Sequence, residues 1–263
     1  MLQINPKLET ENIIEFIKNT LAKQGFKNLV IGVSGGVDSA VAHHLACQAI
    51  GKNNIFAYFL PYKNQSLPNF NTINLKVIDI AEIVEKILMS LRGVKRRSNP
   101  DEIPINRDDK LTTANIIARV RMIVLFAKAQ KHRALVLGTE NRSENLLGYF
   151  TRFGDAASDI EPISHLYKTQ VYQLAKYLKI PQSIINAKPT AGLWPNQTDE
   201  AEFGFSYKLA DEILYRYFDK KEQLADLEKE FGKKTVEKVL KRVKNNLFKQ
   251  FVPYRLQPVF SKA

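Results

Sequence analysis

The sequence predicts an α/β protein whose doubly wound, mainly parallel sheet is flanked by helices. Short apolar runs rich in β-branched residues occur at residues 29–33, 55–60 and 134–138. Stretches in which apolar residues recur at helical spacing separate these runs. Strands that are apolar along their whole length are typical of a parallel sheet that is covered on both faces.

The elements can be placed in order along the chain. Helical spacing of apolar residues predicts a helix over residues 9–24, which ends at Gly25 because glycine tolerates the left-handed conformation of a helix end. The strand at residues 29–33 runs through a glycine-rich turn into a helix that opens at Ala40. The remaining elements are expected as strands at residues 55–60, 76–80 and 134–138 and as helices at residues 113–132 and 168–179.

Two polar stretches without periodicity, residues 61–71 and 93–109, are predicted to be mobile loops at the edge of the sheet. In the helix at residues 113–132, Arg119 and Arg121 lie about 200° apart around the axis, so they cannot share a face. One of the two arginines is therefore available to a ligand.

Composition limits the class of protein. At 263 residues the chain is expected to form a single domain, residues 1–263, without repeats or low-complexity segments. The sequence shows no signal peptide and no stretch that approaches a membrane span. Its one cysteine, Cys47, cannot form an intrachain disulfide. A cytoplasmic protein is the simplest interpretation.

The net charge of +12 leaves two interpretations open. Basic residues gather at residues 92–97 and in the C-terminal third, where acidic residues accompany only the start of the run. Such runs form solvated helix faces or contact a polyanion, which is either a nucleic acid or a small molecule rich in phosphates.

The most informative stretch is the apolar strand that runs into Ser34-Gly-Gly-Val-Asp-Ser39 and then into a helix. This pattern predicts a cradle for phosphates. Gly35 and Gly36 allow a positive φ and aim amide groups at an anion, and the serine hydroxyls add donors at the positive end of the helix. Asp38 would repel a phosphate unless a cation lay between them, which implies Mg²⁺. The alternative is a glycine-rich turn with a capping side chain.

A second polar stretch, residues 139–144, follows the strand at residues 134–138. It lies at the carboxyl end of a strand, where open α/β sheets bind ligands. Carboxylates beside cations continue through residues 148–155 and 159–163. An ordinary surface loop is the alternative interpretation of this pattern.

Seven blocks of the sequence resemble, in the same order, those of the NAD synthetases, a family of N-type ATP pyrophosphatases. The first block has neither the Walker A nor the Rossmann spacing. The resemblance covers about residues 10–255. The blocks are Ser34-Gly-Gly-Val-Asp-Ser39, Asn115-Ile-Ile-Ala-Arg119-Val-Arg-Met122, Gly138-Thr-Glu-Asn-Arg-Ser-Glu144, Gly148-Tyr-Phe-Thr-Arg-Phe-Gly-Asp155, Leu166-Tyr-Lys-Thr-Gln-Val171, Lys188-Pro-Thr-Ala-Gly-Leu-Trp194 and Gln197-Thr-Asp-Glu200.

The resemblance implies an adenine nucleotide alpha hydrolase-like fold and a ligase that converts deamido-NAD to NAD. Family members adenylate the nicotinate carboxylate with ATP, release pyrophosphate, and let ammonia displace AMP. We expect no protein nucleophile, because geometry and electrostatics carry such a reaction. The resemblance also implies a homodimer, with the helices at residues 113–132 and 168–179 as candidate contacts, and it implies neither a membrane nor a nucleic-acid partner.

The resemblance also assigns site residues. Asp38 and Glu144 would bind Mg²⁺, and Lys168 would face the departing phosphates. Asp155 would hold ammonium and accept its proton, so the expected catalytic residues are Asp38, Lys168 and Asp155. The expected ATP contacts are Gly32, Val33, Ser34, Gly35, Gly36, Val37, Asp38, Ser39, Thr139, Lys168 and Thr190. The expected deamido-NAD contacts are Arg119, Arg152, Asp159, Phe248 and Lys249.

Several positions depart from the family pattern. Arg152 stands in place of a usual lysine, Phe248 in place of a usual histidine, and Ala114 in place of a usual glycine. Ala156-Ala157 stand where a glycine pair is common, and the loop after Leu60 is short and lacks the usual acidic stretch. These departures predict altered substrate affinity or a relative with a different use.

Two other functions stay open at the level of sequence. A tRNA-modifying adenylating enzyme of the same superfamily would use the same loop, and the positive charge favours it. A catalytically inactive nucleotide-binding protein is the second, although Asp38, Glu144 and Lys168 are all present. A separate glutamine-hydrolysing subunit is an alternative source of the ammonia.

Overall fold

The structure, a computed structural model, describes residues 2–63, 65, 75–92, 107–190 and 197–254. Most residues of the two predicted loops, 61–71 and 93–109, lie outside the described residues.

Four parallel strands form one sheet in the order β3-β2-β1-β4, which confirms the predicted α/β class. The sheet is centred on β1, where Val30 is in register with Phe56 of β2 and with Val136 of β4. The strands are β1 (Asn28–Gly32), β2 (Ile55–Phe59), β3 (Leu75–Val77) and β4 (Ala134–Leu137).

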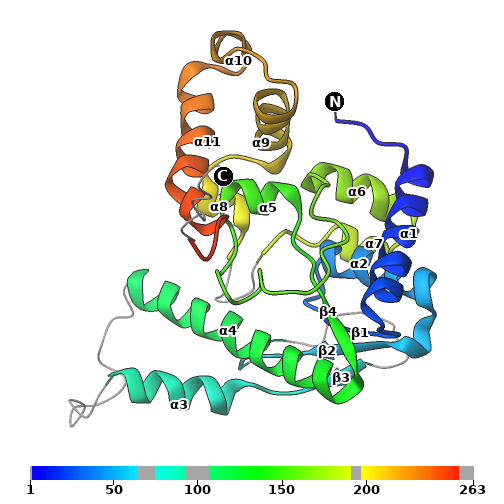
Figure 1. The fold of residues 1–263 in the computed structure, drawn as a ribbon. Coiled ribbons are helices and arrows are strands. Elements are labelled where there is room, and N and C mark those ends of the chain that lie inside the picture. The colour runs from blue at the N-terminus through cyan, green and yellow to red at the C-terminus, as the bar shows by residue number, and fades with distance from the viewer. Residues whose placement is uncertain (1, 64, 66–74, 93–106, 191–196, 255–263) are drawn as a thin grey trace, which may run out of the picture.

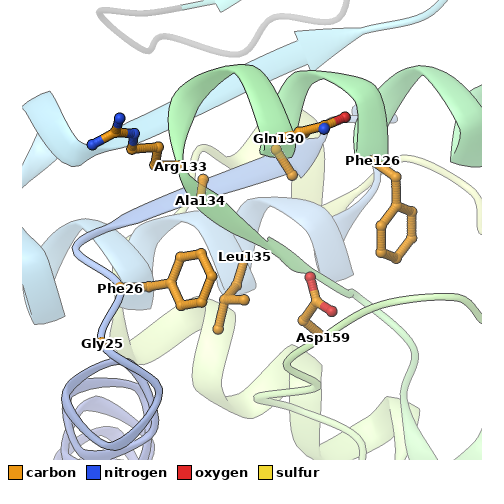
Figure 2. Close-up of a pocket in the computed structure, with 9 residues that line it drawn as sticks. Gly25, Phe26, Phe126, Gln130, Arg133, Ala134, Leu135 and Asp159 are labelled. Carbon is orange, nitrogen blue, oxygen red and sulfur yellow. The ribbon is translucent and has the colours of Figure 1, made fainter.

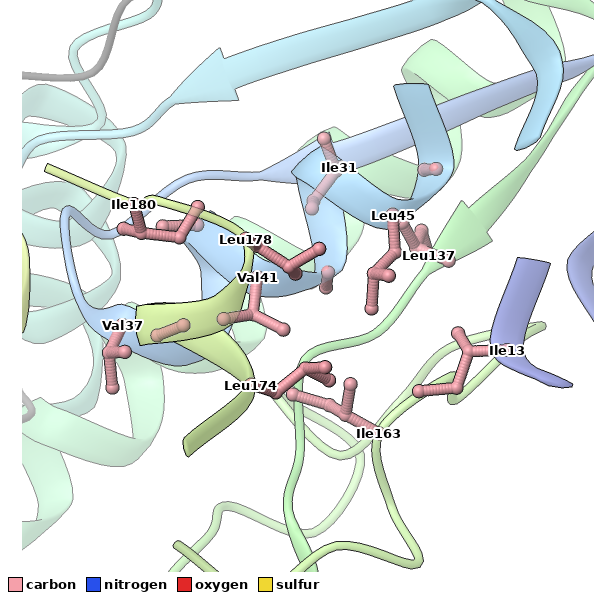
Figure 3. Close-up of a cluster of buried hydrophobic side chains, with 14 of the residues drawn as sticks. Ile13, Ile31, Val37, Val41, Leu45, Leu137, Ile163, Leu174, Leu178 and Ile180 are labelled. Carbon is pink, nitrogen blue, oxygen red and sulfur yellow. The ribbon is translucent and has the colours of Figure 1, made fainter. Parts of the chain in front are cut away.

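Helices cover both faces of the sheet (Figure 1). Figure 3 shows the cluster on one face, where Val41 and Leu45 of α2 lie with Leu174 of α6. The helices of this face are α1 (Pro6–Gln24), α2 (Val37–Ile50), α6 (Lys168–Tyr177) and α7 (Gln182–Ile185), and those of the other face are α3 (Ala81–Arg92) and α4 (Arg107–His132).

Three helices begin earlier than the sequence predicted. α1 begins at Pro6 rather than at residue 9, because the Asn5 side chain accepts a hydrogen bond from the Leu8 amide and proline is favoured in a first turn. α2 begins at Val37, before the expected Ala40. α4 begins at Arg107, so the last residues of the predicted loop at residues 93–109 are helical.

A third buried cluster, which the sequence did not predict, lies next to the segment after β4, apart from the clusters on the two faces of the sheet. In α11, three valines at helical spacing, Val236, Val239 and Val243, face this cluster and the lysines are exposed, as expected for a solvated helix face. Among the helices in the described ranges, none has the length and hydrophobicity of a membrane span. The helices around this third cluster are α5 (Arg142–Leu147), α8 (Asp199–Phe203), α9 (Tyr207–Leu214), α10 (Leu224–Phe231) and α11 (Lys233–Asn246).

The topology brings two distant segments together. β1 and β4 are parallel neighbours, so the loop that follows β1 and the polar residues that follow β4 lie at the same edge of the sheet. This edge is formed by the carboxyl ends of the strands, where α/β proteins bind ligands.

Candidate active site

The loop between β1 and α2 turns at Gly35, whose φ of 86° favours glycine. The prediction that Gly36 also needs a positive φ is wrong, because its φ is −80° and it is the extended N-cap residue of α2. A Cβ at Gly36 would lie 3.3 Å from the Ser34 hydroxyl, so a close approach rather than a turn favours glycine there.

The two serine hydroxyls of the loop bond within the loop itself. Ser34 Oγ and Ser39 Oγ lie 3.2 Å apart, and the Gly36 amide donates to Ser34 Oγ at 3.2 Å. Ser39 Oγ donates to the Gly36 carbonyl at 3.0 Å. These bonds hold the loop in shape before any ligand is bound.

The amides of the loop divide into two groups. The Val33 amide donates to the Tyr58 carbonyl at 2.9 Å, so the expected ATP contact at Val33 cannot come from that amide without breaking the bond. The amides of Val37, Asp38 and Ser39 belong to the first turn of α2, where a helix supplies no internal acceptor. These three amides are the donors that suit an anion.

Lys168 brings the two expected Mg²⁺ ligands together. Its Nζ lies 2.5 Å from Asp38 Oδ2 and 3.1 Å from Glu144 Oε1. The residue is only 3% exposed although it is the first residue of α6, which excludes an ordinary surface lysine. Three segments far apart in the sequence thus form one buried group of charges, here called the Lys168 cluster.

Asn141, which sequence reasoning missed, joins the two carboxylates of this cluster. Its Nδ2 donates to Asp38 Oδ1 at 2.9 Å, and its Oδ1 accepts from the Glu144 amide at 3.0 Å. Glu144 Oε2 accepts from the Asn141 amide at 3.4 Å, which completes a capping box at the start of α5. The spacing Asn-x-x-Glu was the signal in the sequence that could have identified Asn141.

A second missed residue, Asp211 of α9, anchors the helices that carry Glu144 and Lys168. Its Oδ1 accepts from Ser143 Oγ at 2.5 Å and its Oδ2 from the Thr169 amide at 2.8 Å. Ser143 Oγ also accepts from the Lys168 amide at 2.8 Å. Burial raises the pKa of Asp211 to about 6. No motif marks this residue, because only the packing of α9 against α5 and α6 places it there.

Carboxylates outnumber cations in the Lys168 cluster. Besides Asp38 and Glu144, the charge of Asp199 on α8 also acts on Lys168. Burial lowers the pKa of Lys168, but the carboxylates, Asp38 first, outweigh burial and hold that pKa above its ordinary value. Burial raises the pKa of Glu144, and the lysine ammonium opposes that shift. The excess of negative charge favours the binding of a further cation.

The donor set fits a magnesium ion. Within the described ranges, no group of three or more His, Cys, Asp or Glu side chains surrounds a metal position. Mg²⁺ needs fewer protein ligands, because it keeps several waters and is usually bound by one or two carboxylates together with substrate phosphates. Asp38 and Glu144 already share one cation, the Lys168 ammonium, so their oxygens converge as such a site requires.

A second acidic group, Glu140 and Glu161, follows β4 and was not expected. The Glu140 amide donates to Glu161 Oε2 at 3.1 Å. Burial and then repulsion by Glu161 raise the pKa of Glu140 to about 8, and burial raises the pKa of Glu161 to about 7. The expected catalytic residue Asp155 acts on both by its charge, and its Oδ1 accepts from the Thr151 amide at 2.9 Å. These three carboxyls form an acidic group beside the Lys168 cluster.

Arg119 and Arg121 of α4 face different surroundings, as their spacing predicted. Arg121 donates to the Leu60 carbonyl at 3.1 Å and to Gln65 Oε1 at 2.8 Å, so it fixes the segment after β2. Arg119 is exposed and donates to the Arg152 carbonyl at 3.2 Å. Arg119 is therefore the arginine that a ligand can reach.

Three further expected deamido-NAD contacts, Arg152, Phe248 and Lys249, gather near the same segment. The Lys249 ammonium donates to the carbonyls of Gly148 at 2.7 Å and Phe150 at 3.1 Å. Two of the departures from the family pattern contact each other, because the Arg152 guanidinium lies 5.6 Å from the centre of the Phe248 ring. This is a cation–π contact, for which a planar guanidinium is well suited.

Asp159, the last expected deamido-NAD contact, lies in the wall of a cavity of about 550 Å³ beside β4. Its Oδ2 accepts from the Val136 amide at 2.7 Å. Figure 2 shows Asp159 together with Phe26, Phe126 and Leu135 along this strand. The cavity is open to solvent, and Gly25, Arg133 and Ala134 in its lining lie at the amino ends of β1 and β4, opposite the edge that carries the Lys168 cluster.

Three expected ATP residues, Gly32, Thr139 and Thr190, lie outside the Lys168 cluster. Gly32 ends β1, and a Cβ there would lie 3.0 Å from Leu125 of α4, so packing accounts for this glycine. Thr139 follows β4 and is half-buried. Thr190 is exposed and precedes residues 191–196, which lie outside the described residues. Their roles in ATP binding stay predictions.

The chain matches known proteins over nearly its whole length. A model of the NAD synthase family matches residues 9–253. A curated protein of Pyrococcus furiosus, named NH(3)-dependent NAD(+) synthetase, is 42% identical over 96% of this chain and 95% of its own.

Two solved structures share the fold. NMN synthetase from Francisella tularensis is 30% identical with a TM-score of 0.78, covering 98% of this chain and 100% of that chain. NH3-dependent NAD synthetase from Campylobacter jejuni is 27% identical with a TM-score of 0.75, covering 97% of this chain and 100% of that chain.

Proposed function

Because this chain belongs to the NAD synthase family, we propose that the Lys168 cluster is the centre at which it uses ATP. The chain is a ligase that catalyses the ATP-dependent amidation of deamido-NAD to NAD, which confirms the predicted function and disfavours the tRNA-modifying alternative. One observation carries the placement: the buried Lys168 ammonium lies 2.5 Å from Asp38, in the first turn of α2, where helix amides favour an anion.

The first step of the reaction is adenylation. A nicotinate oxygen bonds to the α-phosphorus of ATP while the bond from that phosphorus to the pyrophosphate oxygen breaks. The amides of Val37, Asp38 and Ser39 would hold phosphate oxygens, and Lys168 would donate to the leaving pyrophosphate and offset its charge. Asp38 and Glu144 would hold Mg²⁺, which supplies further positive charge to the phosphates when it is bound.

The second step needs a proton acceptor. Ammonia bonds to the activated carboxyl carbon, AMP leaves with the bonding electrons, and the new nitrogen must lose a proton. We place the acceptor at Asp155, which stands beside Glu140 and Glu161. Burial raises the pKa of Asp155, so its carboxylate takes up a proton more readily than an ordinary aspartate does. The negative charge of the Asp155 carboxylate would also attract ammonium.

Binding of deamido-NAD is proposed for the cations around residues 148–153. Arg119, Arg152 and Lys249 offer positive charge to the two phosphates of the dinucleotide. Asp159 stays a predicted contact, because the cavity that it lines lies opposite the edge that carries the Lys168 cluster.

A homodimer of single-domain subunits stays part of the proposal. Leu111 and Ile123 on α4 are 58% and 59% exposed, so this helix offers apolar contacts. The apolar side of α6 is less suitable, because Val171 and Leu174 are buried in the core. Light scattering of the wild type and of Ile123→Lys tests the interface, and loss of the dimer in the variant is the expected result.

The experiment that tests the function is a product assay. Purified protein with ATP, Mg²⁺, ammonium and deamido-NAD should form NAD and AMP in equal amounts, and EDTA should stop the reaction. ADP as the product would contradict adenylation. Glutamine in place of ammonium should give no NAD unless a separate glutamine-hydrolysing protein is added.

The likeness to an NMN synthetase motivates a second substrate in the same assay. Nicotinic acid mononucleotide carries the same carboxylate on a shorter carrier, so the chemistry of its amidation is the same. We expect kcat/KM to be higher for deamido-NAD, because the mononucleotide lacks one phosphate for the cations around residues 148–153. A higher kcat/KM for the mononucleotide would make NMN synthesis the better description.

A further inference from the structure

Asp199 is a buried carboxylate that the proposed reaction does not use. It is the first residue of α8 and is only 3% exposed. Its Oδ2 accepts from the Tyr207 hydroxyl at 3.0 Å, whereas its Oδ1 is buried without a hydrogen-bond partner among the residues described. Such an atom destabilises a folded protein, so its presence calls for a functional reason.

Lys168 offers the complementary group. An ammonium has three donors, and the described carboxylates accept from it at two places, Asp38 and Glu144. Its Nζ lies 5.3 Å from the centre of the Tyr207 ring, and the hydroxyl of that same ring bonds to Asp199. Tyr207 therefore contacts both the lysine ammonium, through its ring, and Asp199, through its hydroxyl, which donates to Oδ2 and leaves Oδ1 unpartnered.

The surroundings of Asp199 fix its position. Its amide donates to the Pro189 carbonyl at 3.1 Å, and Thr198 caps the helix that it begins. The nearby Tyr149 hydroxyl donates to Glu202 Oε1 at 3.4 Å and also opposes the rise that burial causes in the pKa of Asp199. Asp199 is thus held in place while one of its oxygens stays available.

We propose that Asp199 is a positioning residue. Its free Oδ1 accepts a hydrogen bond from the Lys168 ammonium when Asp38 and Glu144 coordinate a cation bound with ATP. This inference rests on the proposed function. Mg²⁺ between Asp38 and Glu144 would compete for both acceptors of the lysine. Asp199 would then hold one hydrogen of the ammonium and leave the others for the departing pyrophosphate.

The kinetic test compares Asp199→Asn with a control on the same helix. Asp199→Asn should lower kcat about 10- to 100-fold, the effect of one charge-assisted hydrogen bond, while KM for ATP changes less than about threefold. Glu202→Gln removes a charge from an exposed side chain of α8 and should change kcat less than about twofold. In a Lys168→Gln background, Asp199→Asn should have no further effect.

A thermal test gives a readout that does not depend on turnover. Asp199→Asn should leave the melting temperature of the free protein unchanged or raise it, because it removes a buried charge with an unpartnered oxygen. The rise in melting temperature on adding Mg²⁺ and α,β-methylene ATP should be smaller in the variant than in the wild type. A purely structural role predicts the opposite, a lower melting temperature of the free variant.

Three results would overturn the proposal. The first is a kcat of Asp199→Asn equal to that of the wild type. The second is a kcat that higher Mg²⁺ restores, which would mean that Asp199 binds the metal. The third is a loss of activity in proportion to the unfolded fraction of the variant. If Asp199→Asn does not fold, Tyr207→Phe is the substitute variant, because it keeps the ring but removes the hydroxyl that bonds to Asp199. Its kcat and its rise in melting temperature with Mg²⁺ and α,β-methylene ATP are then measured in place of those of Asp199→Asn. If the wild type makes no AMP, the proposed function fails, whereas the thermal comparison still tests Asp199.

Discussion

The Lys168 ammonium and the Asp38 carboxylate lie 2.5 Å apart although 130 residues separate them in the sequence. Their contact joins the start of α6 to the first turn of α2, next to the glycine loop. A buried ion pair contributes little to stability by itself, because desolvation offsets the attraction. Its position at a helix N-terminus that suits phosphates instead indicates a role in the reaction.

Replacing Lys168 by glutamine should lower kcat about 100- to 1000-fold, the loss seen when a donor to a developing negative charge is removed. Lys168→Arg should not restore the rate, because a planar guanidinium differs in shape from the ammonium that this buried site encloses. Initial rates of AMP formation measure both variants. Lys176→Gln, on an exposed position of the same helix, is the control and should keep wild-type kcat.

Asn141→Ala should lower the free energy of unfolding by about 1–3 kcal/mol, because it removes a helix cap and leaves Asp38 without one hydrogen-bond donor. Urea unfolding measures the loss. Asn5 caps α1 at an exposed site, so Asn5→Ala should lower that free energy by only about 0.5–1 kcal/mol and leave turnover unchanged. Equal effects of the two substitutions would contradict the role of Asn141 between the carboxylates.

Arg119 and Arg121 of α4 should respond differently to alanine substitution. Arg119→Ala should raise KM for deamido-NAD about tenfold or more, since a hydrogen bond to a charged group is lost, and should leave stability unchanged. Arg121→Ala should instead lower the melting temperature, because Arg121 holds the Leu60 carbonyl and Gln65. A reversal of these two effects would place the ligand on the other side of the helix.

Gly148 and Gly25 form a matched pair for stability. Both end helices in the left-handed region, with φ of 63° and 75°. A Cβ at Gly148 would lie 2.2 Å from the Asn246 Cβ, whereas nothing lies within 4 Å of one at Gly25. Gly25→Ala should therefore lower the free energy of unfolding by about 1 kcal/mol from backbone strain alone. Gly148→Ala should lower it by about 2–4 kcal/mol, because overpacking adds to that strain.

Glu140 should make the protein less stable as the pH rises. Its pKa is raised from 4.5 to about 8, so between these values the folded state holds a proton that the unfolded chain has lost. The unfolded state then binds fewer protons, and the free energy of unfolding falls as pH rises through this window. Glu140→Gln removes this contribution. The free energy of unfolding of this variant minus that of the wild type should increase from pH 5 to pH 8 and stay constant above pH 8. Urea unfolding at several pH values measures this difference. A difference that is the same at every pH would refute the raised pKa of Glu140.

The sequence by itself determined the parallel α/β class and the cradle after β1. Apolar periodicity and turn chemistry are local properties, so they predicted the strands and the glycine loop to within a few residues. Resemblance then selected Asp38, Glu144 and Lys168, which the structure brings together. Local patterns also separated Arg119 from Arg121, because the angle between them depends only on helix geometry.

Only the tertiary structure decided which groups surround that lysine. Asp199, Tyr207 and Asp211 belong to helices that the sequence did not predict, and no spacing in the chain links them to the glycine loop. The packing of α8 and α9 against α5 and α6 places them there. Contacts between distant segments depend on how whole elements pack, and that information is not contained in any single stretch of sequence.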